Sequence, residues 1–104
     1  MFNKKELMNY YLDFYEELLT DKQQKICNYY FREDYSITEI AELESISRAG
    51  VHDAIKRSEL ALEDFEKKLN CYESFNKRQE YYKKIKEFNN QEINKIIDQC
   101  IDTE

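Results

Sequence analysis

The 104-residue sequence contains no proline and only one glycine, Gly50. Many tight β-turns need one of these two residue types, so their scarcity argues against a sheet built from short hairpins. Good helix formers such as Glu, Lys and Leu are plentiful. Aromatic residues make up 14% of the chain and argue against disorder, although 37% of the residues are charged. We therefore predict an all-α fold.

The sequence also offers little for metal binding or catalysis. His52 is the only histidine, and the three cysteines, Cys27, Cys71 and Cys100, are too widely spaced for a zinc site. No Ser, Cys or carboxylate stands at a recognisable catalytic spacing from His52. We expect free thiols, which fit a reducing cytosol, and neither a metal, a cofactor nor enzyme activity.

Long apolar runs are missing as well. None approaches the roughly 18 residues that a membrane-spanning helix needs, and no signal peptide opens the chain. We expect a cytoplasmic protein without membrane insertion. The length fits one helical domain over residues 1–104, with a helix-turn-helix core in 1–70 and bracing or dimerising helices in 71–104.

The stretch from Ser36 to Arg57 predicts two helices joined by a tight corner. Ser36 and Glu39 have the spacing of a capping box, and Ser47 offers a second N-cap eleven residues after the first. The apolar faces of the two helices would be Ile37, Ile40 and Ala41, then Val51, Ala54 and Ile55. This is the pattern of a helix-turn-helix whose second helix can enter a DNA groove.

The corner itself reads Glu44-Ser45-Ile46. Many such turns have glycine where this one has Ser45, so a positive φ at that position would place some strain on the serine. We expect Ile46 to tuck beneath the corner and fix the angle between the two helices.

The second helix should present a polar face to solvent. Its outward residues would be Arg48, Ala49, His52, Asp53 and Lys56. Gly50 allows either close approach to DNA or tight packing on a neighbouring helix. The apolar series Val51, Ile55, Leu62, Phe65 and Leu69 extends the predicted helix to about Leu69, and Asn70 would break it.

Together with LTDKQQKICNYYF before it, this segment resembles the fourth region of bacterial sigma factors. The longer stretch FYEELLTDKQQKICNYYFREDYSITEIAELESISRAGVHDAIKRSELALEDFEKKL resembles the YlxM family of small bacterial proteins. The similarity covers roughly residues 7–88. It implies a sigma-like DNA-binding fold and a role in regulating signal recognition particle genes or that pathway.

The segment before the helix-turn-helix should form two more helices. The first, from about Lys4 to Leu19, has two adjacent apolar stripes, which would brace the helix-turn-helix or, alternatively, form a partner surface. Thr20 caps the second, which runs to about Arg32. On its outer side Lys22 and Lys25 could meet phosphates, as the corresponding helix does in sigma-like folds.

The net charge of −6 is the main objection to DNA binding, because nucleic-acid binders usually present a basic field. No third of the chain is basic overall, but Ser47–Arg57 carries a local charge of +2 and Asn76–Lys86 one of +4. Any DNA affinity should therefore be local and steeply salt-dependent. The run from Lys77 to Lys86 is open to three readings: a solvated face, a second backbone contact, or a surface for RNA or an acidic protein.

Two further helices are predicted in the tail. One runs from about Tyr72 to Phe88 with Phe75, Tyr82 and Ile85 inward. The other follows a cap at Asn89 or Asn90, and its inward residues would be Ile93, Ile96, Ile97, Cys100 and Ile101. Their surplus apolar surface could brace the first helix or form a homodimer contact.

These patterns support two hypotheses. The first is a transcriptional regulator that binds double-stranded DNA through Lys22, Lys25, Ser47, Arg48, Ala49, His52, Asp53, Lys56 and Arg57. The second is an adaptor that keeps the fold but binds a protein or RNA component of the signal recognition particle. Convergence of the basic side chains on one patch would favour DNA binding, and interruption by carboxylates would favour the adaptor.

Overall fold

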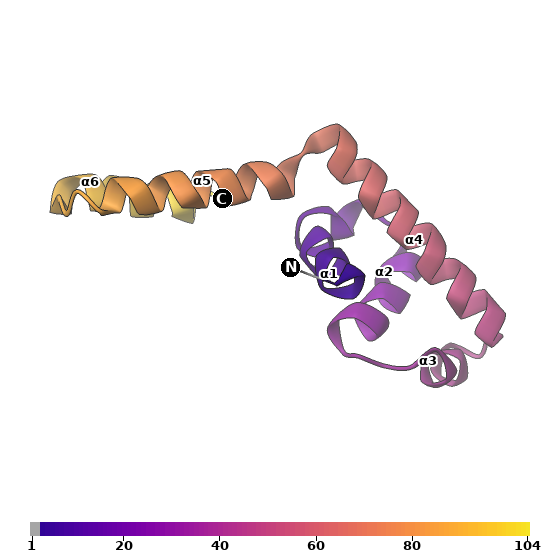
Figure 1. Ribbon diagram of the computed structural model, residues 1–104. Helices are drawn as coiled ribbons and strands as arrows, with labels where there is room; N and C mark the ends of the chain where they lie inside the picture. Colours follow the sequence, from indigo (N-terminus) through magenta and orange to yellow (C-terminus); the bar gives the residue numbers. More distant parts are fainter. Residues whose placement is uncertain (1–2) are drawn as a thin grey trace. The chain divides into compact units, whose positions relative to one another are not determined.

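The computed structural model describes residues 3–104, and every regular element in this range is helical (Figure 1). The elements are α1 (Lys4–Tyr15), the 3-10 turn η1 (Glu16–Leu18), α2 (Asp21–Cys27), the π-helix η2 (Asn28–Arg32), α3 (Ile37–Glu44), α4 (Arg48–Leu69), α5 (Cys71–Lys86) and α6 (Gln91–Asp102). The all-α prediction is confirmed. The described residues form two compact units, one ending at Tyr72 and the other comprising Glu73–Glu104.

Polar side chains set where the helices begin. Thr20 and Ser36 each close a full capping box, in which the hydroxyl accepts from the N–H three residues on and that residue's side chain accepts from the cap's own N–H. Ser47 Oγ accepts from the Gly50 N–H at 2.9 Å, so the predicted cap of α4 is present. Asn90, one of the two predicted candidates, caps α6.

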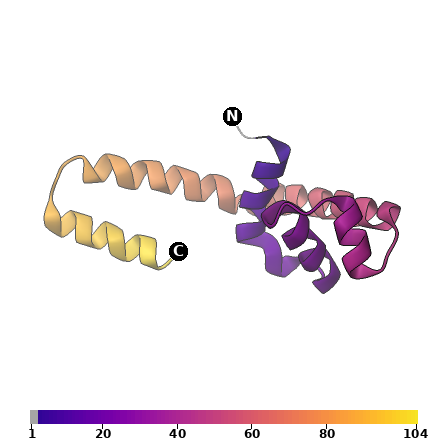
Figure 2. The same ribbon diagram turned by 90° about the horizontal axis from the view of Figure 1, so that it is seen from below.

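Helix α4 is the centre of the first unit, because it packs against α1, α2 and α3 (Figures 1 and 2). Its buried residues are Val51, Ile55, Ser58 and Leu62. Ser58 is the one polar member of this row, and its hydroxyl donates to the Ala54 carbonyl at 2.7 Å. Around this row lie Met8, Leu12, Tyr15, Leu19, Ile26, Cys27, Phe31, Ile40 and Ala41.

One helix end differs from the prediction, and one residue of the predicted apolar series is exposed. Helix α1 ends at Tyr15 rather than near Leu19, because the backbone at Tyr15 leaves the helical region and tightens into η1. Leu18 therefore faces solvent, at 55% exposure, while Leu19 stays buried. Helix α4 ends at Leu69, as predicted, and Asn70 follows it with a φ of 56°. Leu69 itself, the last member of the predicted apolar series, is 55% exposed.

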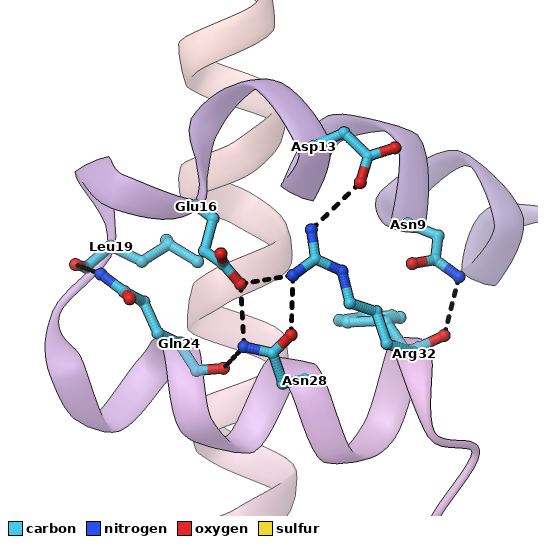
Figure 3. Close-up of polar contacts among 8 residues, drawn as sticks. Asn9, Asp13, Glu16, Leu19, Gln24, Asn28 and Arg32 are labelled. Atoms are coloured by element: carbon cyan, nitrogen blue, oxygen red, sulfur yellow. Dashed lines mark hydrogen bonds and ion pairs between the residues drawn. The ribbon is translucent and has the colours of Figure 1, made fainter.

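Helix α2 continues into the π-helix η2, and a polar network fastens this segment to α1 and η1 (Figure 3). Arg32 is its hub: one guanidinium nitrogen is 2.5 Å from Glu16 Oε2 and the other is 3.0 Å from Asp13 Oδ1. Asn28 donates to the same Glu16 oxygen and to the Gln24 carbonyl. The network holds the wider helical turns of η2 against the core.

The start of α5 belongs to the first unit. The Tyr72 ring lies against three rings of α1, with centroid distances of 5.4 Å to Tyr10, 5.6 Å to Tyr11 and 6.1 Å to Phe14. Tyr72 thus packs on the first helix as a residue of the first unit, and the bracing role predicted for the tail helices stays a prediction.

The second unit is a hairpin in which α5 and α6 run antiparallel (Figure 2). Lys86 pairs with Asp98 at 2.9 Å, and Arg78 pairs with Glu104 at 2.7 Å. Ile97 is its only buried hydrophobic residue among those described. The prediction that Ile85, Ile93, Ile96 and Cys100 point inward is wrong for this chain, because a two-helix hairpin covers only one side of each helix.

No helix within residues 3–104 has both the length and the apolar composition that crossing a bilayer would require.

Candidate nucleic-acid interface

The corner between α3 and α4 is closed by backbone hydrogen bonds around a left-handed serine. Ser45 has φ 54° and ψ 42°, as the glycine-like position of this turn predicted. The Ile46 N–H donates to the Ala41 carbonyl at 3.1 Å, and the Ser45 N–H donates to the Glu42 carbonyl at 3.4 Å. This is a Schellman motif, which satisfies the last carbonyls of α3 and turns the chain directly into α4.

Ile46 is half-buried and packs against the core of the first unit, as predicted. It also lies near Gly50: a Cβ added to Gly50 would stand 3.9 Å from Ile46 Cδ1 and 3.1 Å from Ser47 Oγ. Both neighbours belong to the corner and the cap rather than to a neighbouring helix, so the predicted tight packing on such a helix is wrong, while the close approach to DNA stays a prediction. Gly50 therefore leaves room for the Ser47 hydroxyl that caps α4.

The first turns of α4 present their polar side to solvent. Arg48, Ala49, His52, Asp53 and Lys56 are all exposed, and so is Arg57. Val51 and Ile55 occupy the opposite, buried side of the helix. Helices α3 and the N-terminal end of α4 lie together at one end of the first unit in both views (Figures 1 and 2).

The cations of this region differ in their ion pairing. Lys25 Nζ is 3.3 Å from Glu44 Oε2, and Arg57 Nε is 2.8 Å from Asp53 Oδ2. Within the part of the chain that the structure describes, Lys22, Arg48 and Lys56 form no ion pair. Carboxylates therefore neutralise two of the five basic side chains, and three remain available to a ligand.

Helix α3 carries three carboxylates next to this face, Glu39, Glu42 and Glu44. Glu39 is held by the capping box, where its side chain accepts from the Ser36 N–H at 3.0 Å. Glu44 is committed to Lys25. Glu42 is exposed to solvent beside the corner. The face is thus mixed in charge: its basic groups lie on α2 and α4, and its acidic groups are those of α3 together with Asp53 on α4.

Sequence reasoning did not find the part played by Glu44. It was read only as a corner residue, yet it pairs with a lysine nineteen positions earlier, on another helix. No local signal could have shown this contact, because it depends on how α2 and α3 each pack against α4.

Comparison with known proteins places the chain among helix-turn-helix proteins. A family model described as "UPF0122: Putative helix-turn-helix protein, YlxM / p13 like" matches residues 2–102. A UPF0122 protein of Oceanobacillus iheyensis is 46% identical over 86 residues, which cover 83% of this chain and 82% of the relative. One of Malacoplasma penetrans is 47% identical over 94 residues, covering 89% and 81% respectively. One of Anoxybacillus flavithermus is 40% identical over 103 residues, covering 93% and 94%.

Proposed function

The chain belongs to the UPF0122 family of helix-turn-helix proteins, and we propose that it binds double-stranded DNA as a transcriptional regulator. In this proposal the segment Ser47–Arg57 enters the major groove. Genes of the signal recognition particle pathway are the proposed targets, on the strength of the resemblance to the YlxM family.

The observation that best supports the proposal is that Arg48 is exposed and forms no ion pair within the described residues. It stands in the first turn of α4, directly after the Ser47 cap. Recognition helices contact base edges with residues of this first turn. An unpaired guanidinium there can form a bidentate contact with guanine, and the small Ala49 beside it permits close approach.

The remaining contacts would position the helix on the backbone. Lys22 and Lys56 are exposed and can meet phosphates directly. Lys25 and Arg57 would have to exchange a carboxylate for a phosphate. Their present ion pairs are solvent-exposed on at least one side, and such pairs contribute only about 0–1 kcal/mol, so the exchange costs little.

Binding to random-sequence duplex DNA at two salt concentrations tests the proposal. Fluorescence anisotropy of a labelled duplex should rise with protein at low salt. If three phosphates are neutralised, the logarithm of the association constant should fall with the logarithm of the salt concentration with a slope of about −3. Selection from genomic fragments would then find the specific site. Absence of binding even at low salt would rule out the proposal.

A second candidate is favoured by the carboxylates of α3. In a docked helix-turn-helix the first helix crosses the DNA backbone, where Glu42 would approach phosphates. The same face could instead bind a protein, and the protein would then be an adaptor of the signal recognition particle pathway. An adaptor that binds RNA could contact it through Lys83 and Lys84, which form no ion pair within the described chain.

The same assay separates the two candidates. A labelled folded RNA, including the particle's own RNA, and the particle's protein component take the place of the duplex. Binding to one of these without binding to duplex DNA at low salt would select the adaptor. Tight duplex binding that Arg48→Ala weakens would select the regulator.

A further inference from the structure

The hairpin of the second unit has a second apolar side that its own two helices, α5 and α6, leave exposed. This apolar face consists of Tyr81 and Ile85 on α5, Phe88 in the turn, and Ile93, Ile96 and Cys100 on α6. The exposed fractions reach 57% at Tyr81, 59% at Ile96 and 81% at Phe88. Contiguous exposed apolar surface of this kind marks an interaction site in a water-soluble unit.

The spacing shows that both helices turn this face to the same side. On α6, Ile93, Ile96 and Cys100 each directly precede an inward residue, namely Asn94, the buried Ile97 and the half-buried Ile101. On α5, Tyr81 and Ile85 precede Tyr82 and Lys86, whose side chains bond to residues at the end of the chain and on α6.

One residue turns a helix by about 100°, so each exposed row is rotated from its inward row by that angle in the same sense. Because α5 and α6 are antiparallel, equal rotations about their own axes bring both rows to one side of the hairpin. The six residues therefore form one continuous face rather than two separate ones.

We propose that the apolar face is the contact between two copies of this chain, which pair their hairpins into a four-helix bundle. A single hairpin buries only Ile97, and α6 has only 12 residues, which is too short to be stable without packing. A second hairpin stacked on this face would bury the exposed apolar side chains and form a core between the four helices. A self-complementary face of this kind generates a two-fold dimer.

Charge selects how the two hairpins stack. Helix α5 carries five basic and two acidic residues, whereas α6 carries three acidic residues and one basic residue. A two-fold axis parallel to the helices places α5 of one copy over α6 of the other, so that opposite charges meet twice. An axis across the helices would stack α5 on α5 and α6 on α6, and like charges would repel. The first arrangement is the one we propose.

Sedimentation equilibrium of the full chain across micromolar concentrations tests the dimer, independently of any DNA binding. The wild type should have twice the 12.8 kDa mass of one chain. Ile96→Glu should be monomeric, because the carboxylate would be buried unpaired between the copies. Gln91→Glu adds the same charge at an exposed position of α6, about 140° around the helix from Ile96, and should remain dimeric.

Ile96→Ala is a second variant that tests the same contact without a charge, in case Ile96→Glu fails to fold. Ile96 is 59% exposed in one chain, so its truncation leaves no cavity there, and the dimer dissociation constant should rise about tenfold. Circular dichroism should give the same helix content for the wild type and this variant at equal degrees of dimerisation. A monomeric wild type at every concentration, or a dimer that both Ile96 variants leave as tight as before, would overturn the proposal.

Discussion

The Tyr15 hydroxyl lies 2.5 Å from Glu66 Oε1, and this contact joins the end of α1 to the last turns of α4. The same two side chains also cap α5. Tyr15 Oη accepts from the Cys71 N–H at 2.9 Å, and Glu66 Oε1 accepts from the Tyr72 N–H at 3.0 Å. Two N–H groups at the start of α5, which have no partner within the helix, are satisfied by residues of α1 and α4.

We expect Tyr15→Phe to destabilise the first unit by about 1–3 kcal/mol, because it removes the acceptor of a backbone N–H and the donor to a partly buried carboxylate. Tyr15 is 1% exposed, so water cannot easily take the place of its hydroxyl. Chemical denaturation followed by circular dichroism measures the loss. Tyr35→Phe makes the same chemical change in a half-buried ring and should shift the unfolding free energy by less than about 0.5 kcal/mol. Equal losses in both variants would contradict the capping role.

The unfolding free energy should fall as the pH rises above about 8.5, the value at which an unfolded thiol ionises. Burial raises the pKa of the Cys27 thiol, which is fully enclosed in the core. The folded state therefore keeps a proton that the unfolded state releases. The free energy of unfolding keeps its full value below the pKa of the thiol in the unfolded chain. Above that pKa it falls by up to about 1.4 kcal/mol per pH unit for one thiol.

Cys27→Ala should flatten this dependence between about pH 8.5 and 10, whereas Cys100→Ala, at an exposed position, should leave it as steep as in the wild type. Burial, followed by the hydrogen bond with Glu66, also raises the pKa of Tyr15, so a second decline should begin above about pH 10. Denaturation midpoints at a series of pH values give both slopes. An unchanged slope in Cys27→Ala would contradict the assignment.

The parts of the fold that depend on local pattern could be predicted from the sequence. The spacing of Ser36 and Glu39 predicted the start of α3, and the spacing of Val51, Ile55 and Leu62 predicted the length of α4. Both signals lie within one or two helical turns, where side chains and backbone interact directly. The left-handed Ser45 could be predicted for the same reason, because the corner leaves no other residue to turn the chain.

Contacts between distant segments could not be predicted in this way. Tyr15 and Glu66 are 51 positions apart, and Lys25 and Glu44 meet only because α2 and α3 both pack against α4. The π-helix η2 has no sequence signature and depends on the network around Arg32. The predicted inward residues of α6 included both of its apolar rows, because periodicity identifies apolar positions but does not count how many neighbours will cover them.

Ser45→Gly should stabilise the first unit by roughly 0.5–1 kcal/mol. The left-handed conformation costs a non-glycine residue about 1–2 kcal/mol, which glycine would avoid. Glycine also loses more conformational freedom on folding, and this offsets about 0.5–1 kcal/mol of the stabilisation. Ser45→Ala keeps a Cβ at the same φ and should bring no gain. Denaturation curves give the unfolding free energies of the two variants. Equal stabilisation by both would show that backbone strain at Ser45 is not the cause of the stabilisation.

Three substitutions on α4 test which residues of the proposed DNA interface contact bases and which contact phosphates. Arg48→Ala should cost about 1–3 kcal/mol on the selected site and relax the preference at one base pair, because a bidentate contact to guanine is lost. Lys56→Ala should weaken binding equally on every sequence and reduce the salt slope by about one unit, because it removes a phosphate contact.

The matched control is Lys67→Ala, which removes one positive charge from an exposed position of the same helix, about 28 Å from Arg48. At physiological salt this separation exceeds the screening length of about 8 Å, so Lys67→Ala should leave DNA affinity nearly unchanged although the net charge shifts by the same amount. Affinities for the selected site and for random duplex, measured at two salt concentrations, separate the three outcomes. If Arg48→Ala weakens both duplexes alike, Arg48 contacts phosphate and specificity lies elsewhere. If all three variants weaken binding equally, the attraction is a property of the total charge, and no groove is entered by the first turn of α4.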